Sequence, residues 1–114
     1  MSLSIGAKQE LFSYLLAQLI IFAYGKGYKI RIGEVERSKE QAERNAASGK
    51  GISNSLHLIR LAADLHLFKD GKYLTETEDH RELGEFWESL HELARWGGRF
   101  GDGNHYSIEH NGVK

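Results

Sequence analysis

The hydrophobic pattern of the chain opens with a long segment, residues 7–24, in which apolar side chains recur at helical spacing. The recurrence runs from Leu11 through Leu19 to Phe22, and neighbouring apolar residues widen the face. A repeat of three to four residues is typical of a helix with one buried side. The segment ends near Gly25, a residue type common just after helices. We therefore predict a helix over residues 7–24.

Strand patterns occupy three later segments. Residues 28–35 alternate between apolar and polar side chains, as in a strand with one buried face. Residues 59–68 are a second strand candidate, and residues 105–109 are a third. The pair Asp70-Gly71 follows the second candidate closely, and Asp-Gly is a strong signal for a β-hairpin turn.

Two further helices are indicated by their capping residues. Ser38 with Gln41 fits the S-x-x-Q capping box of a short helix, and Asp79 with Glu82 begins a last helix. The expected buried face of that last helix comprises Leu83, Phe86, Trp87, Leu90, Leu93 and Ala94. Helices and hairpin strands mixed without βαβ repetition predict an α+β fold, a small antiparallel β-sheet flanked by helices.

Length and composition fit one compact domain spanning residues 1–114. Lys and Arg number 15 against 16 Asp and Glu, a formal net charge of -1. A dedicated nucleic-acid binder would carry a basic surplus, so we expect no nucleic-acid partner. The chain has no cysteine, which excludes disulfides, thiolate metal ligands and cysteine nucleophiles. Any metal must be bound by nitrogen and oxygen, and six His supply nitrogen.

The longest apolar stretch, residues 11–24, is too short to cross a bilayer. As a helix it would span about 21 Å, against about 30 Å of hydrocarbon core. It also lacks the basic n-region and small-residue cleavage site of a signal peptide. We therefore expect synthesis in the cytoplasm without stable membrane insertion. We also expect the protein to be a monomer.

Side chains that can bind metal concentrate in two short stretches, one from His57 to Asp64 and one from Asp102 to His105. A catalytic zinc usually has three protein ligands at about 2.0–2.2 Å and an open position for water. In one uninterrupted strand, His57 and Asp64 would lie on opposite faces. In one helix they would be about 10.5 Å apart along the axis. If both bind one ion, the chain must change direction between them.

Both stretches belong to longer motifs. The first is Ser55-x-His57-x6-Asp64 with Ala62, and the second is Trp96-Gly97-Gly98-x-Phe100-x-Asp102-x-x-His105-Tyr106. In this order they resemble the motifs of the M15 zinc peptidases. That family includes D-Ala-D-Ala carboxypeptidases and dipeptidases, and phage endolysins that cut the L-Ala–D-Glu bond of peptidoglycan stem peptides. The resemblance implies a DD-peptidase/hedgehog-like fold with a zinc site at the sheet.

The resemblance also implies a role for each site residue. His57, Asp64 and His105 would bind Zn²⁺, and Asp102, three residues before the last His, would be the general base. Arg37, upstream of the first motif, would help to bind substrate and the developing oxyanion. Zinc lowers the pKa of its bound water towards ~7, so a nearby carboxylate can accept a proton from that water.

The residue at position 102 bears on the choice of function. Many family members have Glu where this chain has Asp102, and the endolysin branch often has Asp. This favours an endolysin-like L-Ala–D-Glu endopeptidase that acts on peptidoglycan stem peptides after release through a holin-type membrane lesion. A D-Ala-D-Ala carboxypeptidase or dipeptidase is one alternative. A non-catalytic, zinc-stabilised wall-binding module is another.

Three positions allow more than one interpretation. Arg60 stands where many family members have Gly, so the local backbone is one open question. His66 shares a strand face with Asp64 and would compete for the metal, support a ligand or occupy a polar surface position. Trp96 either packs as a hydrophobic anchor or binds substrate. His80 is expected on the solvated surface of the last helix.

Overall fold

The computed structural model describes residues 3–36, 56 and 60–110. Its first element is helix α1 (Ile5–Gly25), which confirms the helix predicted over residues 7–24. Ser4 caps the helix, because its hydroxyl oxygen accepts a hydrogen bond from the backbone N–H of Ala7 at 3.1 Å. Among the described residues, no helix is sufficiently long and apolar to cross a membrane.

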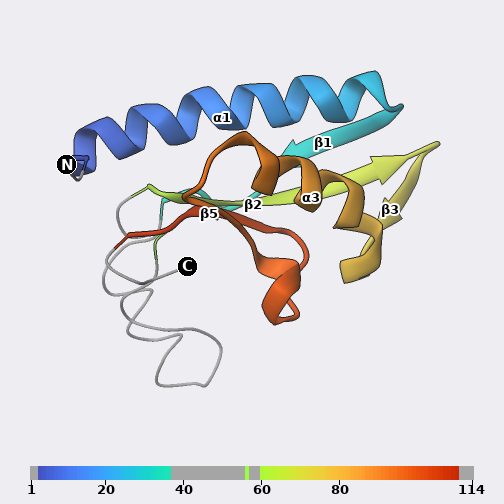
Figure 1. Ribbon diagram of the computed structural model, residues 1–114. Coiled ribbons are helices and arrows are strands. Elements are labelled where there is room, and N and C mark those ends of the chain that lie inside the picture. The colour runs from blue at the N-terminus through green and yellow to red at the C-terminus, as the bar shows by residue number, and fades with distance from the viewer. Residues whose placement is uncertain (1–2, 37–55, 57–59, 111–114) are drawn as a thin grey trace.

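Five strands form one antiparallel sheet, which lies below α1 in Figure 1. They are β1 (Tyr28–Ile32), β2 (Ala62–Lys69), β3 (Lys72–Leu74), β4 (Ala94–Trp96) and β5 (His105–Ile108). The order is β1-β2-β5-β4, and β3 pairs with the far end of β2. With two α-helices beside an antiparallel sheet, the α+β fold class is confirmed.

Both α-helices cover the same face of this sheet. Helix α3 (Arg81–Leu90) follows a 3₁₀ turn, η2 (Thr77–His80). The Trp87 ring of α3 contacts Phe12 of α1 edge-on, with centroids 5.7 Å apart, and Tyr106 of β5 at 6.0 Å. Trp87 and Tyr106 are fully buried, so the core lies between the helices and this face of the sheet.

The β2–β3 hairpin was predicted correctly from its turn residues. Asp70 has φ 53° and Gly71 has φ 78°. Two consecutive residues with positive φ form the type I′ turn that joins twisted antiparallel strands with little strain. Strand β2 itself starts at Ala62, later than the predicted position 59, because Arg60 has φ 56° and cannot continue an extended strand.

The last helix is shorter than the sequence pattern predicted. Helix α3 ends at Leu90, and the next residue, His91, is extended with φ -161° and ψ 150°. Leu93 lies beyond the helix, and Ala94 lies in β4, where it pairs with Ile108. The prediction that Ala94 is buried was right, but its assignment to the helix was wrong. A short strand next to a helix leaves too few residues to distinguish the two periods.

Among the described residues, no α-helix covers the opposite face of the sheet, which is the open face. Leu65 and Leu67 point into the core, whereas the alternating residues Asp64, His66 and Phe68 are only partly buried. Alternate side chains of a strand lie on opposite faces, so these three residues share the open face. This face carries the candidate site. The short helix predicted from Ser38 lies outside the described residues.

Candidate metal centre

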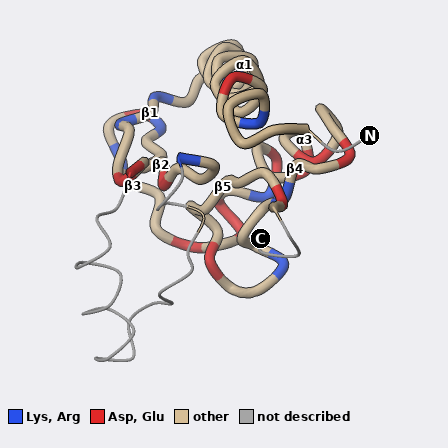
Figure 2. Tube along the Cα trace, turned by 90° about the vertical axis from the view of Figure 1, so that its left-hand side faces the viewer, with Lys and Arg blue, Asp and Glu red and all other residues tan. Residues whose placement is uncertain are grey.

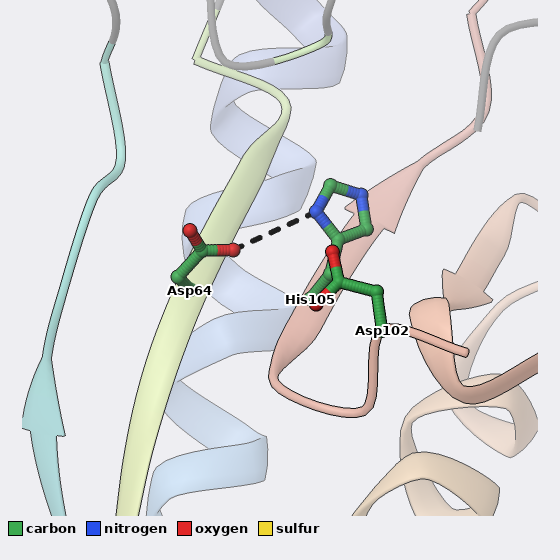
Figure 3. A group of neighbouring side chains, drawn as sticks. All are labelled: Asp64, Asp102 and His105. Carbon is green, nitrogen blue, oxygen red and sulfur yellow. Dashed lines mark ion pairs between the residues drawn. The ribbon is translucent and has the colours of Figure 1, made fainter. Parts of the chain in front are cut away.

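Asp64 and His105 meet across two neighbouring strands on the open face (Figure 3). They are directly paired residues of β2 and β5, and paired residues of antiparallel strands project to the same side. The Oδ1 atom of Asp64 lies 3.7 Å from the Nδ1 atom of His105. Two of the three predicted zinc ligands are therefore neighbours in space, although they are far apart in the chain.

Asp102 reaches the same place from the loop before β5. This loop begins with a short 3₁₀ turn, η3 (Gly97–Phe100). Gly101 caps the end of η3 in the left-handed conformation, with φ 82°. The backbone N–H of Asp102 donates to the Gly97 carbonyl at 2.8 Å, and the N–H of His105 donates to the Asp102 carbonyl at 3.1 Å. These two bonds fix the backbone of Asp102 relative to His105.

Asp64, Asp102 and His105 each offer one ligand atom, and these atoms lie within 4.8 Å of one another. Tetrahedral zinc with ligands at about 2.1 Å places neighbouring ligand atoms about 3.4 Å apart, close to the separation between Asp64 and His105. Carboxylate oxygen and imidazole nitrogen are ligand types that zinc accepts. The donor set among the described residues therefore fits a zinc ion, with the exposed Asp102 beside it.

Glycines let the loop pack this closely against its surroundings. A Cβ atom at Gly97 would lie 2.7 Å from the Cβ of His105 and would also collide with the Asp102 carbonyl. At Gly98, a Cβ would collide with the indole ring of Trp96. That indole donates a hydrogen bond to the Gly103 carbonyl at 2.8 Å and is 1% exposed. Trp96 is therefore an anchor of the loop, the first of its two predicted roles.

The backbone of Asp64 is equally well fixed, from both sides of β2. Its carbonyl accepts a hydrogen bond from Gly33 N–H at 2.7 Å, and its own N–H donates to the Glu34 carbonyl at 2.8 Å. Two residues facing one is the pairing of a β-bulge, a feature frequent beside active sites. On the other side, Leu65 N–H donates to the Asn104 carbonyl at 2.9 Å.

The remaining predicted site residues, His57 and Arg37, lie outside the described residues. Leu61 N–H donates to the Leu56 carbonyl at 3.0 Å. Arg60 has φ 56°, in the left-handed region that favours glycine.

His66 is not a member of the group of ligand atoms found among the described residues. Its Nδ1 atom lies 2.9 Å from the hydroxyl of Tyr73, on β3. Its ring also lies against Gly33, where a Cβ would be 2.7 Å from the His66 Nε2 atom. Of its predicted roles, the polar surface position fits best.

His80 was expected in solvent, and this prediction was wrong, because its side chain is 3% exposed. Its Nδ1 atom forms a 2.8 Å hydrogen bond with the Tyr106 hydroxyl. Burial lowers the pKa of His80 to about 4, against the opposing effect of the Asp79 carboxylate. His80 also lines a cavity of about 180 Å³ that reaches Asp102. The helical pattern gave no sign of this, because His80 precedes α3 in a 3₁₀ turn.

Comparisons with known proteins agree at the level of the fold. No protein-family model matches the chain, and no curated protein matches it significantly. The L-Ala D-Glu endopeptidase ChiX of Serratia marcescens matches with a TM-score of 0.74 and 16% identity, over 86% of this chain and 77% of ChiX. A mutant of the vancomycin resistance D,D-pentapeptidase VanY from a VanB-type cassette, in complex with Zn(II), matches with a TM-score of 0.58 and 19% identity, over 85% and 70% of the two chains.

Proposed function

We propose that this chain is a zinc-dependent peptidase that hydrolyses peptidoglycan stem peptides, with the L-Ala–D-Glu bond as its target. The observation that carries the proposal is the convergence of Asp64, Asp102 and His105 within 4.8 Å on the open face of the sheet. The fold supports it, because the similar structures include a peptidoglycan endopeptidase and a zinc-bound D,D-pentapeptidase.

Each residue of the centre has a distinct task in this proposal. Asp64 and His105, together with His57, hold the zinc ion. When bound, zinc polarises the scissile carbonyl and lowers the pKa of a water towards ~7. Asp102 would accept a proton from that water and deliver it to the leaving amine, a role supported by its exposure and by its proximity to Asp64 and His105. Arg37 is proposed to stabilise the negative charge that develops on the carbonyl oxygen.

The endopeptidase activity has more support than its alternative. The fold is closer to the L-Ala D-Glu endopeptidase, with a TM-score of 0.74, than to the D,D-pentapeptidase, with 0.58. Asp102 points the same way through the M15 resemblance, since the endolysin branch often has Asp there. The likeness to VanY keeps a D-Ala-D-Ala carboxypeptidase or dipeptidase as the second candidate.

Replacing the proposed base gives the first test. Asp102→Ala should lower kcat for wall hydrolysis by at least about 100-fold, the usual range for loss of a general acid–base group, while the protein still binds zinc. The measurements are zinc content by elemental analysis and mass spectrometry of peptidoglycan fragments. Glu10→Gln, which alters an exposed carboxylate on α1, is the control and should keep wild-type activity.

The fragments also decide between the candidate functions. Release of peptides that begin at D-Glu supports the endopeptidase, and release of D-Ala supports the second candidate. Stoichiometric zinc without any hydrolysis by the wild-type protein would overturn both and leave a zinc-stabilised wall-binding module. Full activity of Asp102→Ala would show that another group is the base.

A further inference from the structure

Beyond the metal centre, the open face continues along β2 as a strip of aromatic rings. Phe68 lies on the same face as Asp64, and its ring stacks on that of Tyr73 with centroids 4.9 Å apart and planes 19° apart. The ring of His66 meets Tyr73 edge-on at 5.8 Å. Tyr73 is 47% exposed, so the strip presents ring surface to solvent.

Two cations of β1 border the far end of this strip. Lys29 is paired with Phe68, and Arg31 is paired with His66. Paired residues of antiparallel strands share a face, so both cations lie on the open face with Asp64. The Arg31 guanidinium lies over the Phe68 ring, 4.2 Å from its centroid. Figure 2 shows the basic positions along β1.

Lys29 and Arg31 also line a groove of about 530 Å³ at the β1–β2 end of the sheet. A third cation, Lys69, also lines the groove, and Asp70 is the acidic residue in the lining. Three cations against one carboxylate give this groove a positive potential, although the whole chain has a formal net charge of -1. Such a groove selects for an anionic group.

The groove stands at a defined distance from the proposed chemistry. Phe68 follows Asp64 by four residues on β2, which corresponds to about 13 Å at 3.3 Å per residue. An extended peptide has the same rise per residue, so a peptide along the strip would reach the groove three or four residues from the scissile bond.

We propose that this groove binds a carboxylate in the carboxyl-terminal part of the stem peptide, with Arg31 as the principal partner. The inference rests on the proposed function, because it uses the metal centre to place the scissile bond. Stacking on Phe68 occupies one face of the guanidinium and directs its N–H edge sideways, where a carboxylate accepts two parallel hydrogen bonds. The aromatic strip supports the peptide between the centre and the groove.

The test compares two substrates that differ in one charge. A stem tetrapeptide with a free terminal carboxylate and the same peptide with a terminal amide are hydrolysed by the wild-type protein and by Arg31→Gln. For the carboxylate peptide, Arg31→Gln should raise KM about fivefold with kcat unchanged, the size expected for an exposed ion pair. For the amide peptide, KM should not change. Raising the salt concentration should reduce the difference.

Lys72→Gln is the matched control, because Lys72 is an exposed cation of β3 that does not line the groove. Its KM should stay at the wild-type value for both peptides. An equal rise in KM for Lys72→Gln would overturn the assignment to Arg31, as would an equal loss of kcat by Arg31→Gln on both peptides. Weaker binding to whole cell walls without any change on the defined peptides would assign the groove to an anionic wall polymer instead.

A binding measurement separates this inference from the proposed function. Calorimetry with the carboxyl-terminal fragment of the peptide, which contains no scissile bond, needs no hydrolysis. Wild-type protein should bind the carboxylate fragment about fivefold more tightly than its amide, and Arg31→Gln should bind both alike. If the wild-type protein hydrolyses nothing but shows this preference, the proposed function fails and the groove assignment stands. Equal binding of both fragments by the wild-type protein would overturn the groove assignment.

Discussion

The loop that carries Asp102 and the aromatic strip that Arg31 borders are built in opposite ways. The loop is packed so tightly that Gly97 and Gly98 have no room for a methyl group, and Trp96 beneath it is almost fully buried. The strip is a set of partly exposed rings, bordered by exposed cations, on strands whose backbone is ordinary antiparallel sheet. In the proposed enzyme, backbone packing positions the catalytic groups, whereas exposed side chains select the substrate.

The largest effect is expected where the packing is tightest. Gly97→Ala would force apart the Asp102 carbonyl and the Cβ of His105, which lies 2.7 Å from the new methyl carbon. Misplacement of catalytic groups by about 1 Å costs about 100-fold in rate, so we expect a loss of that size in kcat and weaker zinc binding. Overpacking should also lower the free energy of unfolding by about 1–3 kcal/mol.

Steady-state kinetics measures kcat, a zinc titration measures the zinc affinity, and denaturant unfolding measures the free energy of unfolding. Gly6→Ala is the matched control, because a Cβ at Gly6 meets nothing within 4 Å. It should keep full activity and zinc affinity. If Gly97→Ala bound zinc and turned over substrate like Gly6→Ala, the loop would have room to relax, and the contrast with the strip would not hold.

A smaller effect, on stability rather than on rate, is expected from the protonation of His80, which is buried against Tyr106. Its pKa is lowered from 6.5 in the unfolded chain to about 4, chiefly by burial. The folded protein therefore binds this proton less readily than the unfolded chain does. Stability from this group is complete above about pH 6.5 and decreases as the pH falls towards 4. Protonation of His80 should lower the free energy of unfolding by at most about 3 kcal/mol.

Urea unfolding at several pH values tests this linkage against His80→Asn. Asparagine can take over the hydrogen bond to the Tyr106 hydroxyl but does not titrate. Between pH 7.5 and pH 4, the wild-type protein should lose more stability than the variant, since all other groups titrate alike in both. Parallel curves would mean that His80 has an ordinary pKa and is not desolvated.

Local patterns predicted most of the fold. The apolar period of α1, the Asp70-Gly71 turn and the strand candidate over residues 59–68 each depend on residues close in sequence. The structure confirms the helix and the turn, and it confirms the strand from Ala62 onward. What the sequence did not reveal depends on contacts between distant residues. Strand β4 exists because Ala94 pairs with Ile108, and His80 is buried because Tyr106 arrives from β5.

The candidate site likewise has residues that the sequence predicted and residues that it did not. Motif resemblance predicted Asp64, Asp102 and His105, and the structure brings these three together. His57 and Arg37 stay predictions. The basic groove could not be predicted, because Arg31 and Phe68 meet only through the β1–β2 register. In sequence, Lys29 and Arg31 are two ordinary polar positions of an alternating strand.

The smallest expected effect concerns Arg60, which combines a strained backbone with an exposed side chain. Its φ of 56° costs a residue with a Cβ roughly 1–2 kcal/mol, whereas glycine loses roughly 0.5–1 kcal/mol through its freer unfolded chain. Arg60→Gly should therefore raise the free energy of unfolding by about 0.5 kcal/mol and leave kcat unchanged. Arg60→Ala keeps the Cβ and loses only a 4.0 Å exposed contact with Glu36, so it should be neutral. Urea unfolding of both variants measures the difference. If Arg60→Gly were the less stable of the two, the left-handed backbone would not be the source of strain.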